Sequence, residues 1–152
     1  MNNIVLRKAT IDDVNNGLLQ SYIDGYKFHQ NGRPDIFSIT SDEELENKLL
    51  KDIDRLNIIV ALNENEVVGY IAYEIKEKSS KILYIDQLAI RDEFRKQGIG
   101  RILMEEVKKI GIEINCKRIE FNCWMFNENA LAIYDHLGYK KQRIMYEMNL
   151  YE

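Results

Sequence analysis

The stretch Ile-Leu-Tyr-Ile-Asp-Gln-Leu-Ala-Ile-Arg-Asp-Glu-Phe-Arg-Lys-Gln-Gly-Ile-Gly-Arg, residues 82–101, decides the fold. It predicts a strand whose apolar run ends at Ile90, a short basic turn, and a helix that begins near Gly98 and Gly100. Glycines at a helix N-terminus let a ligand approach the backbone, and the unpaired N–H groups there carry partial positive charge. The stretch therefore predicts a cradle for a phosphate or pyrophosphate group.

Two common phosphate-binding loops do not fit this turn. A P-loop needs G-x-x-x-x-G-K-[ST], and neither that spacing nor a Lys-Ser/Thr pair is present. A dinucleotide-binding fingerprint needs G-x-G-x-x-G, but Leu103 occupies the place of the third glycine. The pattern that remains is Arg95-x-x-Gly98-x-Gly100, directly behind the strand.

A second block lies about thirty residues further along the chain and reads Asn127-x-x-Ala130-x-x-x-Tyr134-x-x-x-Gly138-Tyr139. The two blocks resemble the signatures of the GNAT superfamily of acyl-CoA-dependent N-acyltransferases: a Gln/Arg-x-x-Gly-x-Gly/Ala turn, then a helix bearing Asn and Tyr that ends at Gly-Phe or Gly-Tyr. Residues 4–10 are also similar to the family's first strand. The resemblance covers nearly the whole chain and is loosest over residues 20–50.

Periodicity and capping residues predict the elements. Thr10 with Asp13 gives a capping-box-like start for a helix to about Phe28, and Ser41 with Glu44 starts another. The helix from Gly98 carries an apolar stripe, a second helix spans residues 127–137, and Gly138 ends it. The predicted strands span residues 4–6, 58–62, 67–75, 82–90, 118–124 and 143–150.

This order predicts an α/β (α+β) fold with a central, mostly antiparallel sheet and flanking helices, like that of the GNAT superfamily. The strand–helix–strand from 82 to 124 is expected to be a parallel, right-handed crossover. The length of 152 residues suits a single N-acetyltransferase domain over residues 1–152.

Composition narrows the function. The chain is 45% hydrophobic and 30% charged, with a net charge of −4, which gives no electrostatic support to nucleic-acid binding. It has neither a secretory leader nor an apolar run long enough for a membrane, so we expect a cytoplasmic protein. The mild acidity is compatible with a cationic amine substrate.

Cysteine and histidine usage predicts no metal site. Cys116 and Cys123 form no C-x-x-C pair, and His29 and His136 are far apart in the sequence. We expect no disulfide and two buried or half-buried thiols in and beside a strand. A nucleophilic Cys123 paired with His136 is the alternative interpretation.

Acetyl-CoA is the cosubstrate that the resemblance implies. Main-chain groups of Leu88 and Ile90 would pair with pantetheine like an added strand, and Asn127 and Tyr134 would contact CoA from the second block. The N–H groups at the helix start, with the flanking polar side chains, would hold the pyrophosphate; this set is Arg95, Lys96, Gln97, Gly98, Ile99, Gly100 and Arg101.

The resemblance and the chemistry together indicate catalytic residues. A phenol with a pKa of about 10 is a plausible acid for the departing thiolate, which favours Tyr134, although its place on a helix face also suits packing. Asp86 is the leading candidate for the base, acting through water, and Glu120 is a weaker one. A water chain to solvent would serve instead of either.

The acceptor pocket is expected near the N-terminal helices. Tyr22, Tyr26 and His29 share one helix face, a stripe that is more often core than substrate wall. Trp124 either lines the same cleft or covers the core. His29 is also a weak candidate for the base.

The sequence therefore predicts an acetyl-CoA-dependent N-acetyltransferase that moves an acetyl group to a primary amine by direct attack in a ternary complex. A non-catalytic acyl-CoA-binding regulator is the alternative, and the presence of Tyr134 as an acid favours the enzyme. The acceptor is a small-molecule or peptide amine of open identity. A homodimer paired through residues 143–150 also stays open.

Overall fold

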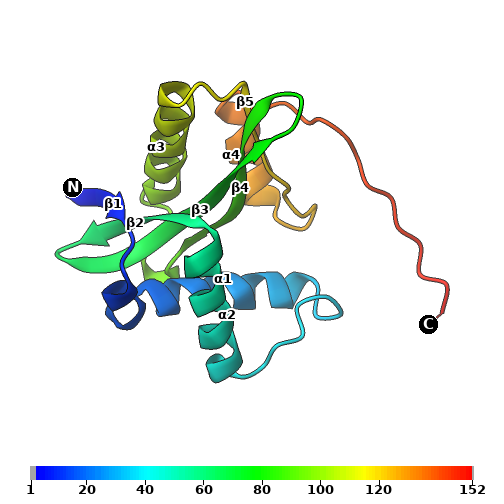
Figure 1. Ribbon diagram of the computed structural model, residues 1–152. Coiled ribbons are helices and arrows are strands. Elements are labelled where there is room, and N and C mark those ends of the chain that lie inside the picture. Colours follow the sequence, from blue (N-terminus) through cyan, green and yellow to red (C-terminus); the bar gives the residue numbers. More distant parts are fainter. Residues whose placement is uncertain (1–2, 152) are drawn as a thin grey trace. The chain divides into compact units, whose positions relative to one another are not determined.

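The computed structural model describes residues 3–151 and has the mixed α/β architecture that the sequence predicts (Figure 1). In chain order its elements are β1 (Ile4–Lys8), η1 (Ile11–Asn16, a 3-10 helix), α1 (Leu18–Gly32), α2 (Asp42–Arg55), β2 (Asn57–Asn63), β3 (Glu66–Glu77), β4 (Lys81–Ile90), η2 (Asp92–Phe94, also 3-10), α3 (Ile99–Glu113), β5 (Arg118–Glu120) and α4 (Glu128–His136).

The chain divides into two compact units, Met1–Asn122 and Cys123–Glu152. The first holds all five strands and the helices up to α3, and the second holds α4 and the C-terminal segment. The sheet and the helices that cover it therefore belong to the first unit alone.

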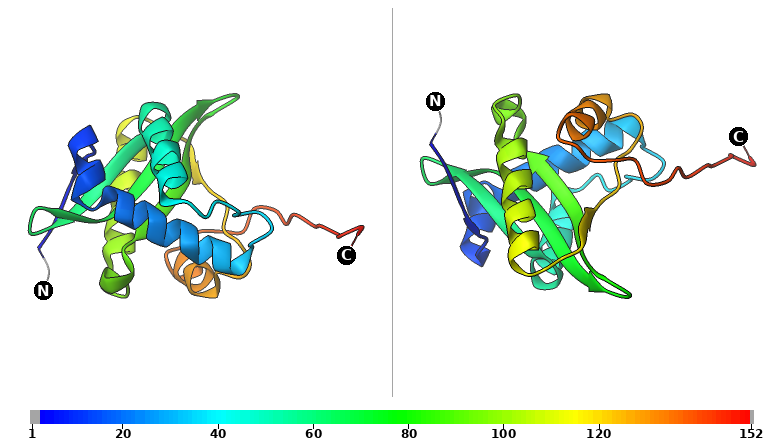
Figure 2. Two further views of the ribbon diagram at one scale, coloured as in Figure 1. Left: turned by 90° about the horizontal axis from the view of Figure 1, so that it is seen from below. Right: turned by 90° about the horizontal axis from the view of Figure 1, so that it is seen from above.

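The sheet of the first unit has the strand order β1-β2-β3-β4-β5. Every neighbouring pair is antiparallel except β4 and β5, which are parallel, as the predicted crossover through α3 requires. α1 and α2 cover one face of the sheet and α3 covers the other (Figure 2). The predicted fold class is confirmed.

Two irregularities in β4 shape the sheet where the site is expected. Its pairing with β5 ends at Tyr84 opposite Glu120, so residues 85–90 pair with β3 alone. Its register with β3 jumps from Gln87 to Ile85, which leaves Asp86 without a partner as a β-bulge.

Both faces of the sheet are closed by apolar side chains. On the α3 side, Leu103 and Val107 are fully buried, which confirms the core of the predicted stripe. On the opposite face, Leu45 and Leu49 of α2 join a buried cluster with α1 and strands β2 and β3.

The first helical region differs from the prediction. A single helix was expected from Thr10 to about Phe28, but the chain forms η1, breaks at Gly17, and continues as α1 to Gly32. Gly17 has a φ of +106°, and a Cβ there would lie 2.2 Å from the carbonyl oxygen of Val67. The positive φ interrupts the helix, and the close approach to β3 leaves no room for a side chain, so glycine is required at the break.

The C-terminal prediction was also wrong. β5 ends at Glu120 rather than Trp124, and residues 143–150 form no strand although apolar side chains recur at every second position from Ile144 to Leu150. All of these residues are exposed. A strand needs a partner edge as well as the right pattern, and this segment is paired with none in residues 3–151.

Candidate active site

We call the loop between β4 and α3, residues 91–98, the donor loop. Near its end, two residues have a left-handed backbone conformation: Lys96 with a φ of 62° and Gly98 with a φ of 79°. Gly98 is the N-cap of α3, and its carbonyl oxygen accepts from the N–H of Ile102 at 3.1 Å. The N–H groups of the first turn have no partner within the helix, so they present the positive end of α3 at this place.

The two glycines of this turn have different reasons to be there. Gly98 has a backbone conformation that other residues rarely adopt. Gly100 has an ordinary helical backbone, and a Cβ on it would meet no atom of residues 3–151 within 4 Å. Alanine would favour the helix at this position by roughly 0.5–1 kcal/mol. Packing within the described chain therefore gives no reason for Gly100, whereas close approach of a ligand does.

The free side of β4 leads toward this helix start. The Arg91 N–H donates to the Val68 carbonyl at 2.8 Å, and hydrogen-bonded positions alternate along an antiparallel pair. Gln87 and Ala89 therefore direct their main-chain groups toward β3. Leu88 and Ile90 direct theirs toward the opposite edge, where β5 no longer pairs with β4. Within residues 3–122 no strand pairs with this part of the edge, as strand addition by a ligand would require.

Most side chains of the donor loop are exposed, and Lys96 and Gln97 are among them. In the first turn of α3, Arg101 is also exposed, while Ile99 is buried and anchors the helix in the core. Arg95 forms an ion pair with Asp92 at 3.0 Å. Part of its charge is therefore already balanced within the loop.

The bulge in β4 turns Asp86 and Gln87 toward the same face. Asp86 Oδ2 accepts from Gln87 Nε2 at 3.0 Å and lies 3.6 Å from the Arg55 guanidinium. Gln87 Nε2 also donates to Asp52 Oδ2 at 2.8 Å. The candidate base is thus joined to a polar network under α2 that the sequence did not reveal.

The centre of this network is Asp52, which is only 5% exposed. Its carboxylate accepts from the Tyr22 hydroxyl at 3.0 Å and from Arg55 at 3.2 Å. Tyr70 donates to Gln87 Oε1 at 2.8 Å. Burial, and then the charge of Asp52, raises the pKa of Tyr22 far above its ordinary value.

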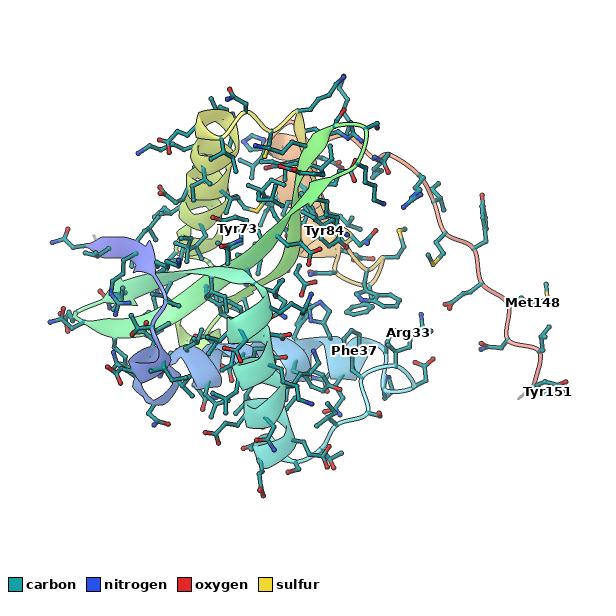
Figure 3. The ribbon with its side chains drawn as sticks, in the orientation of Figure 1. Arg33, Phe37, Tyr73, Tyr84, Met148 and Tyr151 are labelled. Carbon is teal, nitrogen blue, oxygen red and sulfur yellow. The ribbon has the colours of Figure 1, made fainter. Side chains whose placement is uncertain are left out.

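The three predicted acceptor residues of α1 have different surroundings. Tyr22 lies in the core, while the Tyr26 hydroxyl accepts from the N–H of Ile39 at 3.0 Å. His29 Nδ1 lies 2.8 Å from the Gly25 carbonyl oxygen. Its ring lies 5.3 Å from Phe37, at the end of α1 that Figure 3 marks with Arg33 and Phe37. Their role in acceptor binding stays a prediction.

Glu120, the weaker candidate for the base, pairs with Arg118 on the same strand. A group of three or more His, Cys, Asp or Glu side chains that could hold a metal ion is not found in the described part of the chain. In the same residues, no helix is both long and apolar enough to cross a membrane.

The second block of the sequence forms α4, as predicted. Asn127 is its N-cap, and its Oδ1 accepts from the Ala130 N–H at 3.4 Å. The Tyr134 ring lies 6.2 Å from that of Tyr139, and burial raises the pKa of Tyr134 to about 12. Trp124 stacks on Phe126 at 6.0 Å.

The alternative nucleophile in this unit is disfavoured. Both cysteines are free thiols, and burial raises the pKa of Cys123. A nucleophilic cysteine needs its thiolate form, which a raised pKa makes rarer. Cys123 is therefore poorly suited to carry an acyl group.

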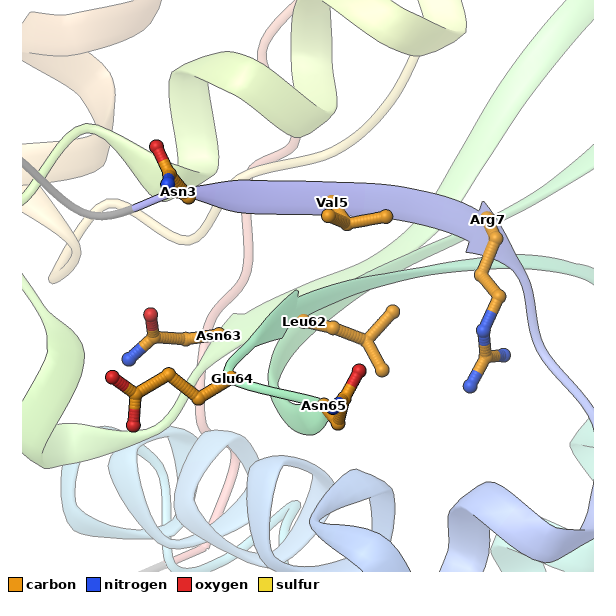
Figure 4. A pocket seen from close by; sticks show the side chains of 7 residues that line it. All are labelled: Asn3, Val5, Arg7, Leu62, Asn63, Glu64 and Asn65. Atoms are coloured by element: carbon orange, nitrogen blue, oxygen red, sulfur yellow. The ribbon is translucent and has the colours of Figure 1, made fainter.

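A hollow of the surface lies at the β1 edge and the β2–β3 turn (Figure 4). It has a volume of about 510 Å³ and is lined by Asn3, Val5, Arg7, Leu62, Asn63, Glu64 and Asn65. None of the predicted site residues lines it.

Comparison with known families decides the class. The model of the acetyltransferase (GNAT) family matches residues 22–139, well over half of the chain. The chain belongs to the GNAT family. This confirms the resemblance drawn from the two sequence blocks and, at the level of the family, the predicted class of acyltransferase that uses acetyl-CoA.

Individual relatives agree with this assignment. An uncharacterized N-acetyltransferase of Archaeoglobus fulgidus is 30% identical over 134 residues, which span 84% of this chain and 85% of that protein. The thialysine N-epsilon-acetyltransferase of Caenorhabditis elegans is 30% identical over 98 residues, 60% of either chain. A Bacillus halodurans protein of known structure has the same fold, with a TM-score of 0.88, 22% identity, and coverage of 97% of this chain and 99% of its own.

Other curated relatives are longer than the region that matches. The aligned part of this chain spans 52% and 60% of the length of two of them. These relatives therefore support the family, while the activity, acceptor and partners of the whole protein are matters for proposal.

Proposed function

We propose that the protein transfers an acetyl group from acetyl-CoA to a primary amine, by direct attack of the amine within a ternary complex. The observation that carries the proposal is the N-terminus of α3 at Gly98 and Gly100, which follows the free edge of β4. Together they provide an anion cradle and a strand edge, which suit the pyrophosphate and the extended pantetheine arm of one cosubstrate.

The donor would be held mainly by main-chain groups. The N–H groups of residues 98–101 would bind the pyrophosphate, with Arg95, Lys96 and Gln97 at its flank. The main chain of Leu88 and Ile90 would pair with pantetheine, and one of its N–H groups would stabilise the oxyanion. Asn127 would contact CoA while also capping α4.

The reaction needs one bond formed and one broken. The neutral amine nitrogen attacks the thioester carbonyl carbon, a C–N bond forms, and the C–S bond breaks. The phenolic proton of Tyr134 passes to the departing sulfur, and the surplus amine proton passes through water to Asp86. Because no nucleophile stands out among residues 3–151 to carry the acetyl group, the proposal involves no covalent acyl-enzyme intermediate.

The acceptor is a primary amine on a small molecule or a peptide. The names of relatives, such as thialysine N-epsilon-acetyltransferase, support an amine in general. A net charge of −4 is compatible with a cationic acceptor. The expectation of a cytoplasmic location rests on the sequence alone.

The proposal includes a homodimer. Apolar side chains recur at every second position from Ile144 to Leu150, as in a strand, but the segment pairs with no strand within residues 3–151. Its main-chain groups would pair with an edge strand of a second copy. Sedimentation velocity would give twice the monomer mass if this pairing forms. A monomer at all protein concentrations would contradict it.

The test of the activity combines free-thiol release from acetyl-CoA over a panel of amines with calorimetric titration of CoA. We expect CoA to bind, and thiol to be released with one class of amine. Binding without turnover on any amine would favour the acyl-CoA-binding regulator. Absence of CoA binding would contradict the assignment of the donor loop.

A further inference from the structure

Helix α1 contacts the donor loop and the end of β4 through one of its faces. Asp24 Oδ2 accepts from the main-chain N–H of Asp92 at 3.0 Å. A Cβ on Gly25 would lie 2.7 Å from Ala89 Cβ, so the helix backbone approaches the strand closely at this point. One turn further on, the Phe28 ring lies 5.1 Å from the Arg95 guanidinium carbon.

Asp24 of α1 caps the N-terminus of η2 within the donor loop. Asp92 is the first residue of η2, and its N–H has no partner within that short helix. Asp24 accepts from that N–H as an N-cap side chain would, although it belongs to another helix. Gln20 Nε2 donates to the second oxygen of Asp24 at 2.7 Å and fixes its orientation.

Asp24 influences the position of Arg95 through Asp92, which is bonded to both residues. Arg95 pairs with Asp92 at 3.0 Å and lies over Phe28, so its guanidinium is oriented from two sides. A shift of Asp92 would therefore displace a cation that flanks the proposed pyrophosphate site.

The charge of Asp24 argues for a positional role. A carboxylate beside an anion site repels the anion, so attraction of the ligand does not explain why an acid stands here. The hydrogen bond that its oxygen accepts does explain it. The negative charge of Asp24 disfavours CoA binding, whereas the hydrogen bond that it accepts from the Asp92 N–H favours it. Substitutions that remove one and keep the other therefore distinguish the two effects.

We propose that Asp24 is a positioning residue for CoA binding, which holds the donor loop against α1 so that Arg95 and the first turn of α3 face the pyrophosphate. This inference rests on the proposed function. It also links α1, which carries the predicted acceptor residues, to the loop that holds the donor.

The test compares Asp24→Ala with Asp24→Asn, whose side-chain oxygen still accepts from the Asp92 N–H. Asp54→Ala serves as the control, because it removes an exposed carboxylate from α2 and changes the net charge equally. The readouts are the Kd of CoA by calorimetry, KM for acetyl-CoA and for the amine, and hydrogen exchange at the Asp92 amide.

We expect Asp24→Ala to weaken CoA binding by roughly tenfold, because without the hydrogen bond to the Asp92 N–H the donor loop is no longer held in place. KM for acetyl-CoA rises accordingly, KM for the amine stays unchanged, and exchange at Asp92 becomes faster. Asp24→Asn and Asp54→Ala stay within about twofold of the wild type, the range expected of exposed charges.

Two results would overturn the inference alone: CoA binding by Asp24→Ala equal to that of the wild type, or equal losses in the Ala and Asn variants. Failure of the wild type itself to bind CoA would instead overturn the proposed function, and this inference with it.

Discussion

At the scale of single residues, Gly100 allows the requirements of folding to be distinguished from those of ligand binding. Its backbone is helical and its missing Cβ faces open space, so glycine there lowers helix stability without improving packing. Gly111 stands in the same helix, where a Cβ would make ordinary contacts with Leu83 and Cys116 at 3.6 and 3.8 Å.

We therefore predict that Gly100→Ala stabilises the ligand-free protein by about 0.5 kcal/mol but weakens CoA binding at least about tenfold. Chemical denaturation and calorimetric titration measure the two effects. Gly111→Ala is the matched control, since it also adds a methyl group to α3 but lies far from its N-terminus. Unchanged CoA affinity in Gly100→Ala would mean that no ligand approaches this residue.

Tyr134 gives a second prediction at this scale. Because burial raises its pKa to about 12, the phenol stays protonated throughout the range from pH 7 to 10. Tyr134→Phe should lower kcat by about 100-fold or more and leave the Kd of CoA near normal. Tyr139→Phe, at its ring neighbour, is the control.

The pH profile extends this prediction. In the wild type, kcat should show no loss from ionisation of Tyr134 below about pH 11, one unit under its pKa of about 12. A fall in kcat with an apparent pKa near 10 that Tyr134→Phe abolished would show that the group titrates normally. Normal turnover of Tyr134→Phe would remove it from the mechanism.

At the scale of elements, η1 is held by an ion pair between the first strand and its own third residue. Arg7 donates to both oxygens of Asp13, at 2.8 and 2.7 Å, and the Thr10 N–H donates to Oδ2 at 2.7 Å. Hydrogen bonding by Arg7 lowers the pKa of Asp13 below its ordinary value of 3.8. Folding is therefore stabilised by this carboxylate above that value, and the stabilisation is lost as pH falls through the lowered pKa.

We predict that Asp13→Asn lowers the free energy of unfolding at pH 7 by about 2 kcal/mol, since Arg7 is partly solvated and the buried partner is lost. Urea denaturation at pH 7 and at pH 3 should show the difference from wild type shrinking at the lower pH. Asp12→Asn, an exposed neighbour, should change little at either pH. A difference that does not depend on pH would exclude ionisation of Asp13 as its cause.

The sequence predicted those elements whose signal is local. Ser41 and Asn127 cap helices as expected, and Gly98 begins α3. The break at Gly17 was not predicted, because it depends on a contact with Val67 of β3, which is distant in sequence. The bulge at Asp86 was not predicted, because it depends on the register between β4 and β3, which the pattern within one strand does not give. The alternation of residues 143–150 predicted a strand, but it contains no information about a partner.

The polar network had a signal in the sequence that was not used. The buried leucines along α2 are Leu45, Leu49 and the C-cap residue Leu56, and Asp52 falls on the same face between the last two. A lone acid on a buried stripe needs partners from other elements. Tyr22 and Gln87 donate hydrogen bonds to Asp52. No pattern along the chain predicts that these two residues are its partners.

At the scale of the whole molecule, the two compact units raise the question of cooperativity. We propose that they form the single domain expected from the sequence. Trp124, the only tryptophan of the chain, belongs to the second unit, while the first unit holds the sheet and most of the helices. Tryptophan fluorescence and far-UV circular dichroism therefore report on different units.

We predict that both signals change at one midpoint during urea denaturation, as they do when a domain unfolds in one step. The Gly17→Ala variant, strained at a φ of +106° and close to Val67, should shift both midpoints together. Midpoints that separate, or a shift in circular dichroism alone, would show two units that unfold independently.

The free edge of β4 also bears on how such a protein varies through time. A ligand held by main-chain N–H and C=O groups is indifferent to most side chains at the same positions, provided that the strand keeps its course. If pantetheine pairs with β4 as proposed, substitutions at the half-buried Leu88 or Ile90 are constrained by side-chain packing and not by the donor. Sequence drift over most of the chain would then leave the proposed contact intact.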